Sequence, residues 1–525
     1  MGAACSKRGR IYFRTKIDLS PFGVERLASR AILVAAAAWW LALPALADEI
    51  VVMTSGAFTA PFQDAAPWFE RRTGHDVVAV FGASTGGAPD SLPARLARGE
   101  RADIVIASAQ AIDALIASGE VEAGSRRDLV LSRIGMAVRA GAPKPDISSV
   151  DALVRTLRGA RSVAYSASVS GTYLATELFP RLGLADEIAA KGRRIESERV
   201  GAVVARGDAE IGFQQISELV TIEGVDYVGP LPDEVQRVST FSAGIAVGAK
   251  SPAAARELVE FLASVELGPV VERYGLDQIG YRASDWRQLF NGHDLTGWTP
   301  KITHHALGEN FADTFRVRDG VLEVGYEGYD TFAEQFGHLF FAEPFSRYRL
   351  RIEYRFLGAQ APDAPAWAAR NSGVMVHSQA PETILRDQDF PISIEVQFLG
   401  GLSDGKARPT GNVCSPGTRL VYAGAPDTSH CIQSTAPTID GDEWVTADVL
   451  VLGDEHIVHY IDGLPVIEYG GITYGGGNVN GHDSKQKPDG TPLARGYLSL
   501  QSESHPIQFR RVELLNLEKC VAPCR

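Results

Sequence analysis

The stretch LFNGHDLTGW, Leu289 to Trp298, separates two kinds of sequence pattern. It lies a little past the middle of a chain of 525 residues, and single domains rarely exceed roughly 250 residues. Before it, short β-branched runs alternate with helical segments. After it, the long helical patterns stop and alternating strands follow. The stretch therefore reads as the beginning of a second domain.

The pattern downstream of Leu289 predicts an all-β domain. Its segments alternate apolar and polar residues with a period of two and are separated by Gly, Asp and Asn turns, which indicates a two-sheet antiparallel sandwich. Asp462-Gly463 predicts a tight hairpin. The expected strands are TFRVRDGVLEV (314–324), YRLRIEYRFL (348–357), ISIEVQFLG (392–400), WVTADVLVLG (444–453), HIVHYIDGLPVIEY (456–469), GYLSLQS (496–502) and IQFRRVELLNL (507–517).

The pattern upstream predicts an α/β domain of parallel strands with helices on both faces. Ligands bind such sheets at the carboxyl ends of the strands, and those ends are rich in serine and glycine here. These groups can hold an anion, although tight turns need the same residues. We expect a ligand cleft from their repetition. The segments are EIVVMTS (49–55), a helix through Arg72, DVVAVFGAS (76–84), a helix over 91–98, ADIVIAS (102–108) and the cluster YSASVSGTYL (165–174).

Residues 1–47 resemble a secretory leader. The apolar run from Ala31 to Leu46 follows Arg26 and Arg30 and ends in small residues, and it is shorter than the ~20 residues of a membrane-spanning helix. We expect export with cleavage near Ala47, and an uncleaved anchor is the alternative. The leader holds seven basic and two acidic side chains, so the net charge of −13 becomes −18 without it. Such acidity disfavours nucleic acid and anionic lipid as partners and favours a soluble periplasmic or secreted protein.

Four of the five cysteines lie outside the leader: Cys414, Cys431, Cys520 and Cys524. An even number in an exported protein predicts disulfides, and of the three pairings two local bridges are favoured. A zinc site is the weaker interpretation, because neither pair has C-x-x-C spacing. Calcium is the metal that remains an alternative. The loop after Tyr474 has Asp and Asn residues that could bind it, but they lack a recognisable ligand spacing.

Polar side chains share one face on several of the expected strands. Ten of the eleven histidines lie at or beyond His293, which places any proton-transfer chemistry in this half. An ordinary solvated sheet face is the alternative, but sugar-binding and sugar-cleaving sandwiches use such a face. The polar sets are Ser393, Glu395 and Gln397; Gln501, Glu503 and His505; and Arg370, Asn371, Ser372 and His377.

LFNGHDLTGW, together with FGHLFF, RNSGVMVHSQAP, DFPISIEVQF and GYLSLQSESHPIQFRRVEL, resembles the 3-keto-disaccharide hydrolase family, whose fold is the concanavalin-like jelly roll. The resemblance covers residues 284–518. It implies cleavage of glycosides whose sugar carries a ketone at carbon 3, by elimination and rehydration. That route needs a base near C2, an acid near the leaving oxygen and donors for an enolate, but no redox cofactor.

Site roles follow from this resemblance. We expect Glu395 to act as base or acid with His505 and Glu503 as proton-transfer partners, and the sugar or enolate to be held by Arg370, Asn371, His377, Gln397 and Gln501. A glycosidase with paired carboxylates for ordinary sugars is less favoured. The other alternative is a non-catalytic carbohydrate-recognition module in a transport system.

In the first half, EIVVMTSGAF, FGASTGGAPDSLPARLARGERADIVIAS, YSASVSGTYL and VGAVVARGDAEIGFQQISEL resemble the periplasmic molybdate-binding proteins of ABC importers. This implies a two-lobed type II periplasmic-binding fold over residues 48–282, followed after the second domain by a short tail, 519–525. Molybdate binders usually have a tyrosine where this chain has Gln214-Gln215, so a small oxyanion or an organic anion is expected. An ABC permease is an implied partner, although the fused second domain would have to clear it. The ligand-binding positions carried over are Ser55, Ser84, Thr85, Ala167, Ser168, Val200 and Gln214.

Overall fold

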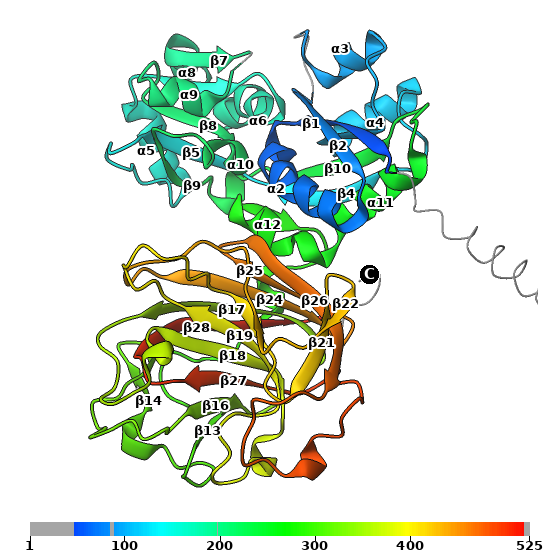
Figure 1. Ribbon diagram of the computed structural model, residues 1–525. Helices are drawn as coiled ribbons and strands as arrows, with labels where there is room; N and C mark the ends of the chain where they lie inside the picture. Colours follow the sequence, from blue (N-terminus) through cyan, green and yellow to red (C-terminus); the bar gives the residue numbers. More distant parts are fainter. Residues whose placement is uncertain (1–46, 85–88, 197, 519–525) are drawn as a thin grey trace, which may run out of the picture. The chain divides into compact units, whose positions relative to one another are not determined.

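The computed structural model describes residues 47–84, 89–196 and 198–518. The expected leader up to residue 46, Thr85, and the tail with Cys520 and Cys524 lie outside these residues. Within the described residues, an α/β domain is followed by a β-sandwich (Figure 1). No helix in these ranges is long and apolar enough to cross a membrane. The predicted order of fold classes is therefore confirmed.

Lobe 1 of the first domain, residues 49–132 and 239–278, contains a six-stranded sheet. Its strands are β1 (Glu49–Ser55), β2 (Asp76–Gly82), β3 (Ile104–Ser108), β4 (Arg127–Ser132), β10 (Ser239–Ile245) and β11 (Leu276–Gln278), in the order β11-β4-β10-β3-β1-β2. Its helices are α2 (Gly56–Thr73), α3 (Leu92–Ala97), α4 (Ala109–Ser118), α11 (Pro252–Ala263) and α12 (Gly268–Arg273). β1 is parallel to β2 and β3 as predicted, but β10 is antiparallel to its neighbours because it carries the chain back from lobe 2.

Lobe 2, residues 134–230, contains a five-stranded sheet. Its strands are β5 (Ile134–Arg139), β6 (Val163–Ser166), β7 (Gly192–Ile195), β8 (Ile211–Gln215) and β9 (Val225–Pro230), in the order β7-β6-β8-β5-β9. Its helices are α5 (Val150–Gly159), α6 (Val169–Tyr173), a π-helical turn (Leu174–Leu178), α7 (Phe179–Arg181), α8 (Ala185–Lys191), α9 (Val200–Ala205) and α10 (Ile216–Leu219). The chain crosses between the lobes twice, after β4 and after β9. Two crossings leave a cleft between lobes as the place for a ligand.

The second domain is a sandwich of two antiparallel sheets. The larger sheet has the order β14-β15-β28-β17-β24-β25-β26-β21-β22, with β12 also paired to β28. Its strands are β12 (Trp286–Gln288), β14 (Phe315–Arg318), β15 (Val321–Val324), β17 (Arg347–Phe356), β21 (Thr418–Tyr422), β22 (Ala425–Asp427), β24 (Val445–Leu452), β25 (His456–Ile461), β26 (Leu464–Tyr474) and β28 (Ile507–Asn516). The smaller sheet, in the order β13-β16-β27-β18-β19-β20-β23, contains β13 (Trp298–Ile302), β16 (Gly337–Phe341), β18 (Asn371–Ser378), β19 (Ile394–Leu399), β20 (Asn412–Cys414), β23 (Cys431–Ile432) and β27 (Tyr497–Ser502).

Two hairpins show how turn residues divide the strands. The segment 314–324, predicted as one strand, is a hairpin of β14 and β15, because Asp319 and Gly320 both have positive φ, at 50° and 78°. The predicted hairpin at Asp462-Gly463 is confirmed, with φ of 47° and 82°. Cys414 and Cys431 form the expected local disulfide, which joins the paired strands β20 and β23.

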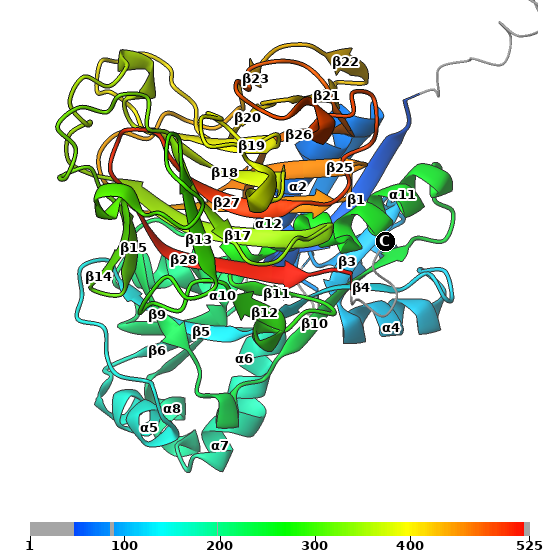
Figure 2. The same cartoon turned by 90° about the horizontal axis from the view of Figure 1, so that it is seen from below.

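The sandwich core lies between the two sheets, which Figure 2 shows from below. On β17 the even-numbered residues, such as Tyr348 and Ile352, pack into this core, and the odd-numbered ones face away from it. This is the two-residue period of a strand. The outward face of the larger sheet also has buried apolar side chains, among them Leu450, Val458 and Tyr460.

Lobe 1 covers that outward face. Leu450, Val458, Tyr460 and Leu515 belong to the same apolar cluster as the core of lobe 1, and Tyr460 makes an edge-to-face contact with Trp68 of α2, with ring centroids 6.0 Å apart. In Figure 1, α12 lies beside the strands of this sheet. The two domains thus share a continuous apolar core.

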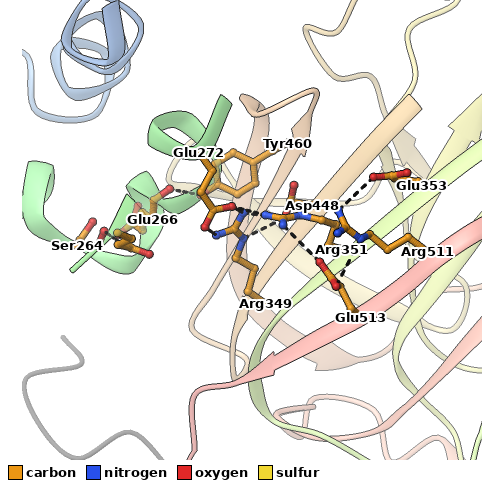
Figure 3. Close-up of polar contacts among 11 residues, drawn as sticks. Ser264, Glu266, Glu272, Arg349, Arg351, Glu353, Asp448, Tyr460, Arg511 and Glu513 are labelled. Atoms are coloured by element: carbon orange, nitrogen blue, oxygen red, sulfur yellow. Dashed lines mark hydrogen bonds and ion pairs between the residues drawn. The ribbon is translucent and has the colours of Figure 1, made fainter. Parts of the chain in front are cut away.

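A buried ion network crosses the same interface (Figure 3). Arg349 of β17 is 1% exposed and donates through Nη1 and Nη2 to Glu272 of α12 at 2.9 and 2.7 Å, and through Nε to Asp448 at 2.9 Å. Arg351 donates to the same two carboxylates and, at 3.3 Å, to Glu513. A buried guanidinium needs such partners, since burying an unpaired charge is strongly destabilising. Glu272 therefore ties α12 to the sandwich.

Replacing Glu272 by Ala removes the bidentate partner of Arg349. The Glu272 side chain is 30% exposed, so we expect a loss of about 2 kcal/mol in the free energy of unfolding, below the range for fully buried pairs. Urea unfolding followed by tryptophan fluorescence measures it. The control is Glu260→Ala on α11, where a 67% exposed carboxylate pairs with Arg127 at 3.5 Å and less than about 0.5 kcal/mol should be lost. Equal losses in the two variants would contradict a special role for Glu272.

Candidate functional sites

The first site is a cavity of about 340 Å³ between the lobes. Lobe 1 contributes the start of α2 and the end of β2, and lobe 2 contributes the ends of β6 and β8. Of the predicted ligand-binding residues, Ser84, Ala167, Ser168 and Gln214 line it. Thr85 lies outside the described residues. Of the strand ends singled out in the sequence, those of β2 and β6 line the cavity, whereas Ser108 at the end of β3 caps α4 by accepting a hydrogen bond from the N–H of Ala111 at 3.3 Å.

Hydroxyl groups form pairs around this cavity. Ser84 donates to Ser55 at 2.6 Å, which connects the predicted Ser55 to the lining, and the hydroxyls of Ser166 and Ser168 are 2.9 Å apart. The amide nitrogen of Gln215, another lining residue, is buried and has no hydrogen-bond partner among the described residues. An unpaired buried donor at a cavity wall is a group that a ligand can satisfy.

Val200 does not join the cavity lining. Its backbone N–H, which was expected to approach an oxyanion, donates instead to Oε1 of Gln214 at 2.9 Å, and its side chain is buried in a small apolar cluster of lobe 2. The glutamine that replaces the expected tyrosine thus occupies a donor that an oxyanion would use. This is the physical reason for the difference from the predicted set.

Glu218 is the cavity residue that the sequence patterns missed. It lies on α10, is almost fully buried, and lines the cavity together with the half-buried Arg199 and the exposed Arg194. Burial raises the pKa of Glu218 to about 7, and the nearby charge of Arg199 and the side chain of Gln214 oppose that rise. A carboxylate in the short segment Ile216–Leu219, whose members are all buried, is a signal that the sequence alone does not make visible.

Gly56 makes room for the Glu218 carboxyl. A Cβ at position 56, where α2 begins, would lie 2.0 Å from Oε1 of Glu218. The acid and the start of the 18-residue helix are therefore in close approach. Partial positive charge at a helix N-terminus favours an anion, so the position suits both the carboxylate and an anionic ligand beside it.

The second site is the face of the smaller sheet that points away from the sandwich core. Ile394, Val396 and Phe398 face the core, so Glu395 and Gln397 face the other way, as the alternation predicts. Register places Gln397 opposite Gly373, Glu395 opposite Met375 and Gln501 opposite His338. Three neighbouring strands, β19, β18 and β27, thus bring the predicted polar residues together.

This face is buried, in contrast to the solvated alternative. Glu395 is 5% and Glu503 4% exposed, and His505 is also buried. Native proteins leave few buried polar atoms without partners, so a cluster of them marks a place where a ligand or ordered water completes the structure. Among the described residues, the polar atoms on this face without a hydrogen-bond partner include Nε2 and Oε1 of Gln501, Oγ of Ser499, Oδ1 of Asn371, Oε2 of Glu503, Nε2 of His338 and both ring nitrogens of His505.

Burial shifts the titration of these groups away from their charged forms. It raises the pKa of Glu395 to about 8, and it raises the pKa of Glu503 well above its ordinary value, with the charge of Glu395 adding to the rise. Burial lowers the pKa of His505 to about 4, and the charge of Arg370 lowers it further. At neutral pH the imidazole is therefore neutral, and the two carboxyls do not both ionise readily.

Two further residues shape this face. Gly373 leaves space for Glu395, because a Cβ at position 373 would lie 3.1 Å from Oε1 of that glutamate. Arg408, which the sequence patterns missed, donates to the backbone carbonyls of Ala369 and Arg370 at 2.6 and 3.1 Å, and its charge works against the rise in the pKa of Glu503. Arg408 is thus a cation whose charge favours the ionised form of Glu503.

The remaining predicted binding residues differ in their surroundings. Arg370 donates to Asp442 at 3.0 Å, and Oε1 of Gln397 accepts from Asn412 at 3.0 Å. His377 is fully buried, and its Nε2 donates to the carbonyl of Gly453 at 2.9 Å. That bond fixes the ring against the turn between β24 and β25, so His377 is not brought into the carboxyl cluster.

One cluster has side chains suited to a metal ion: Glu266, His456 and Glu468. The guanidinium of Arg72 lies among them and donates to Glu266 at 2.7 Å and to Glu468 at 2.6 Å. A cation already balances these carboxylates, so the cluster is an ion-pair network at the domain interface. A calcium ion in the loop after Tyr474 stays a prediction.

Comparisons with known proteins match these two halves. Residues 50–277 match the family of bacterial extracellular solute-binding proteins, and residues 285–515 match the 3-keto-alpha-glucoside-1,2-lyase-like domain. An aconitate isomerase from a Pseudomonas species is 44% identical over 253 residues, which make up 48% of this chain and 96% of the isomerase. A molybdate-binding protein of Azotobacter vinelandii is 27% identical over 256 residues, 46% of this chain and 96% of that protein.

Among solved structures, the periplasmic molybdate-binding protein of Azotobacter vinelandii aligns with a TM-score of 0.37 and 22% identity, over 43% of this chain and 98% of its own. The chain belongs, through residues 50–277, to the bacterial extracellular solute-binding proteins, and it carries a 3-keto-alpha-glucoside-1,2-lyase-like domain at residues 285–515.

Proposed function

We propose that the second domain cleaves glycosides whose sugar is oxidised to a ketone at carbon 3. The observation that supports this is the pair of buried carboxyls, Glu395 and Glu503, surrounded by polar atoms without protein partners. A ketone at C3 acidifies the hydrogen on C2, so the bond between C1 and the leaving oxygen can break by elimination. The matching family is named after a 1,2-lyase, and a lyase of this kind breaks the bond between C1 and the leaving oxygen by elimination.

The carboxyl pair can supply both proton transfers of an elimination. Two neighbouring carboxyls in a buried site do not both ionise readily, so one is a carboxylate while the other keeps its proton. The carboxylate takes the C2 proton, and the electron pair forms the C1–C2 double bond as the glycosidic oxygen leaves and receives a proton from the acid. Addition of water to the unsaturated ketone completes a net hydrolysis. We assign the base to Glu395 and the acid to Glu503.

Donors around the pair would stabilise the enolate that forms at C3. Gln501 has an unpaired amide nitrogen, and Arg408 supplies a cation next to Glu503. Donors that are fixed before the reaction are usually the largest source of rate enhancement, because they need no reorganisation when charge develops. His505, neutral at pH 7, is suited to hold or relay a proton and not to pair with an anion. Arg370, Asn371 and Gln397 are the remaining sugar contacts of this proposal.

For the first domain we propose a second activity, isomerisation of a small unsaturated tricarboxylate such as aconitate. The relative at 44% identity is an aconitate isomerase, and the cavity offers Arg199, Arg194 and the start of α2 to an anion. It also contains an acid of raised pKa, Glu218, which simple binding does not need. Binding of the ligand for import, with an ABC permease as partner in the periplasm, is the competing role.

Glu395→Gln keeps the shape of the proposed base but removes its ability to take a proton. We expect turnover of a 3-keto-disaccharide to fall by roughly 10²- to 10⁴-fold, the usual contribution of a general base, while sugar binding persists. Product formation is followed by chromatography beside Glu382→Gln, which neutralises an exposed carboxylate of the same domain and should leave turnover unchanged. A wild-type chain that binds keto-sugars without cleaving them would favour a recognition module.

Glu503→Gln should stabilise the fold at high pH only. The pKa of Glu503 is higher in the folded than in the unfolded chain, so the native state is favoured at low pH, where the carboxyl is protonated in both states. That advantage is lost as the pH rises above the ordinary glutamate range towards the folded-state pKa. We expect the variant to be more stable than wild type at pH 9 and equally stable at pH 4.5 in urea titrations. Glu382→Gln is again the control, and a gain that does not change with pH would contradict the assignment.

A further inference from the structure

Glu218 is the only carboxyl group among the described cavity-lining residues that is nearly fully buried. Glu196 and Glu198, which also line the cavity, are exposed, and Glu198 is paired with Arg206 at 2.8 Å. A carboxylate in a cleft that receives an anion repels its own ligand, so its presence needs a reason other than affinity. The close approach at Gly56 shows that the fold holds this group at one position.

We propose that Glu218 is the catalytic base of the first domain and that it removes and returns a proton on a carbon atom of the bound carboxylate ligand. This inference rests on the isomerase activity proposed above and names the residue that performs it. The geometry that carries it is a side chain fixed between α10 and the start of α2, at the wall of a cavity formed by both lobes. Its usual alternative, a buried glutamate paired with an arginine, does not apply, because no ion pair joins Glu218 to a cation in the described part of the chain.

The proton transfer balances without any further reagent. The Glu218 carboxylate takes a proton from the methylene group next to the carbon–carbon double bond. The electron pair of that C–H bond forms a new double bond, and the electrons of the old one move to its far carbon. That carbon then receives the proton back from Glu218. The intermediate carbanion is delocalised over neighbouring carboxylates, and rotation before the proton returns interconverts the cis and trans isomers.

Neighbouring groups suit these two half-steps. Gln214 is held by the N–H of Val200 through its oxygen, so its amide nitrogen is the group that approaches Glu218. Burial raises the pKa of Glu218 to about 7, which lets the group both accept and return a proton near neutral pH. Arg199 lines the same cavity and donates to Thr221 at 3.2 Å, which places a cation where carboxylates of the ligand can be held.

The test compares binding and chemistry in the full mature chain. Conversion of cis-aconitate in D₂O is followed by proton NMR, which reports both isomerisation and incorporation of solvent deuterium, and affinity is measured by calorimetry. We expect Glu218→Gln to reduce both NMR signals by at least roughly 100-fold, with affinity for aconitate kept or increased because a negative charge is removed. Glu223→Gln, which neutralises an exposed carboxylate five residues further on, should behave as wild type.

A second variant guards against misfolding of the first. Glu218→Asp keeps a carboxyl group but shortens its side chain by one methylene, so turnover should lie between that of the wild type and that of Glu218→Gln, and thermal unfolding shows whether each variant folds. Full activity in Glu218→Gln would overturn the role of Glu218, and so would a parallel loss of affinity and turnover, which would make it a binding residue. A wild-type chain that binds aconitate without converting it would overturn the inference, and one that does not bind aconitate would overturn the proposed activity of the first domain itself.

Discussion

The arrangement of the two domains depends on the ion pairs that the guanidinium of Arg349 forms. It lies on the outward face of a sandwich strand, where water would normally solvate it, and receives two carboxylates instead: Asp448 from the next strand and Glu272 from α12. Around it, Leu450, Val458 and Tyr460 bury their side chains against lobe 1. Burial of these apolar side chains stabilises the contact between the two domains. The ion network fixes the orientation of that contact, because buried ion pairs contribute more to specificity than to stability.

The second site shows the opposite use of buried charge. The charge of Glu395 adds to the effect of burial in favouring the protonated form of Glu503, and several polar atoms around them have no partner among the described residues. In a purely structural sheet such a group would be destabilising, since an unpaired buried polar atom costs about 1–3 kcal/mol. The sandwich tolerates it because the core on the other face of the same strands is large and continuous. Unpaired buried polar groups of this kind are typical of functional sites.

The sequence patterns predicted the class of each domain, the carboxyl ends of the strands that line the cleft, and the polar face of the smaller sheet. These predictions rest on the local periodicity of the sequence, which follows directly from the alternation of side chains along a strand. The patterns did not reveal Glu218 or Arg408, because each lies in a short segment without a period and acts through contacts distant in the sequence. Burial of the outward face was also missed, although Val449 to Leu452 is apolar at every position, a composition typical of strands covered on both sides. His377 and Val200 are the opposite case. Their positions in the sequence predicted a role in a site, but one hydrogen bond holds each of them away from it.

The polar bonds that join the domains leave lobe 1 only, as far as the described residues extend, through Arg72, Glu266, Glu272 and Arg273. Lobe 2 is connected through the two crossing segments after β4 and β9. Lobe 1 and the sandwich are therefore joined by polar bonds and by a shared apolar cluster, whereas lobe 2 contacts lobe 1 through the crossing segments and through α10, which packs on α2. The cleft between the lobes and the carboxyl pair of the smaller sheet are thus held by separate sets of contacts within one polypeptide.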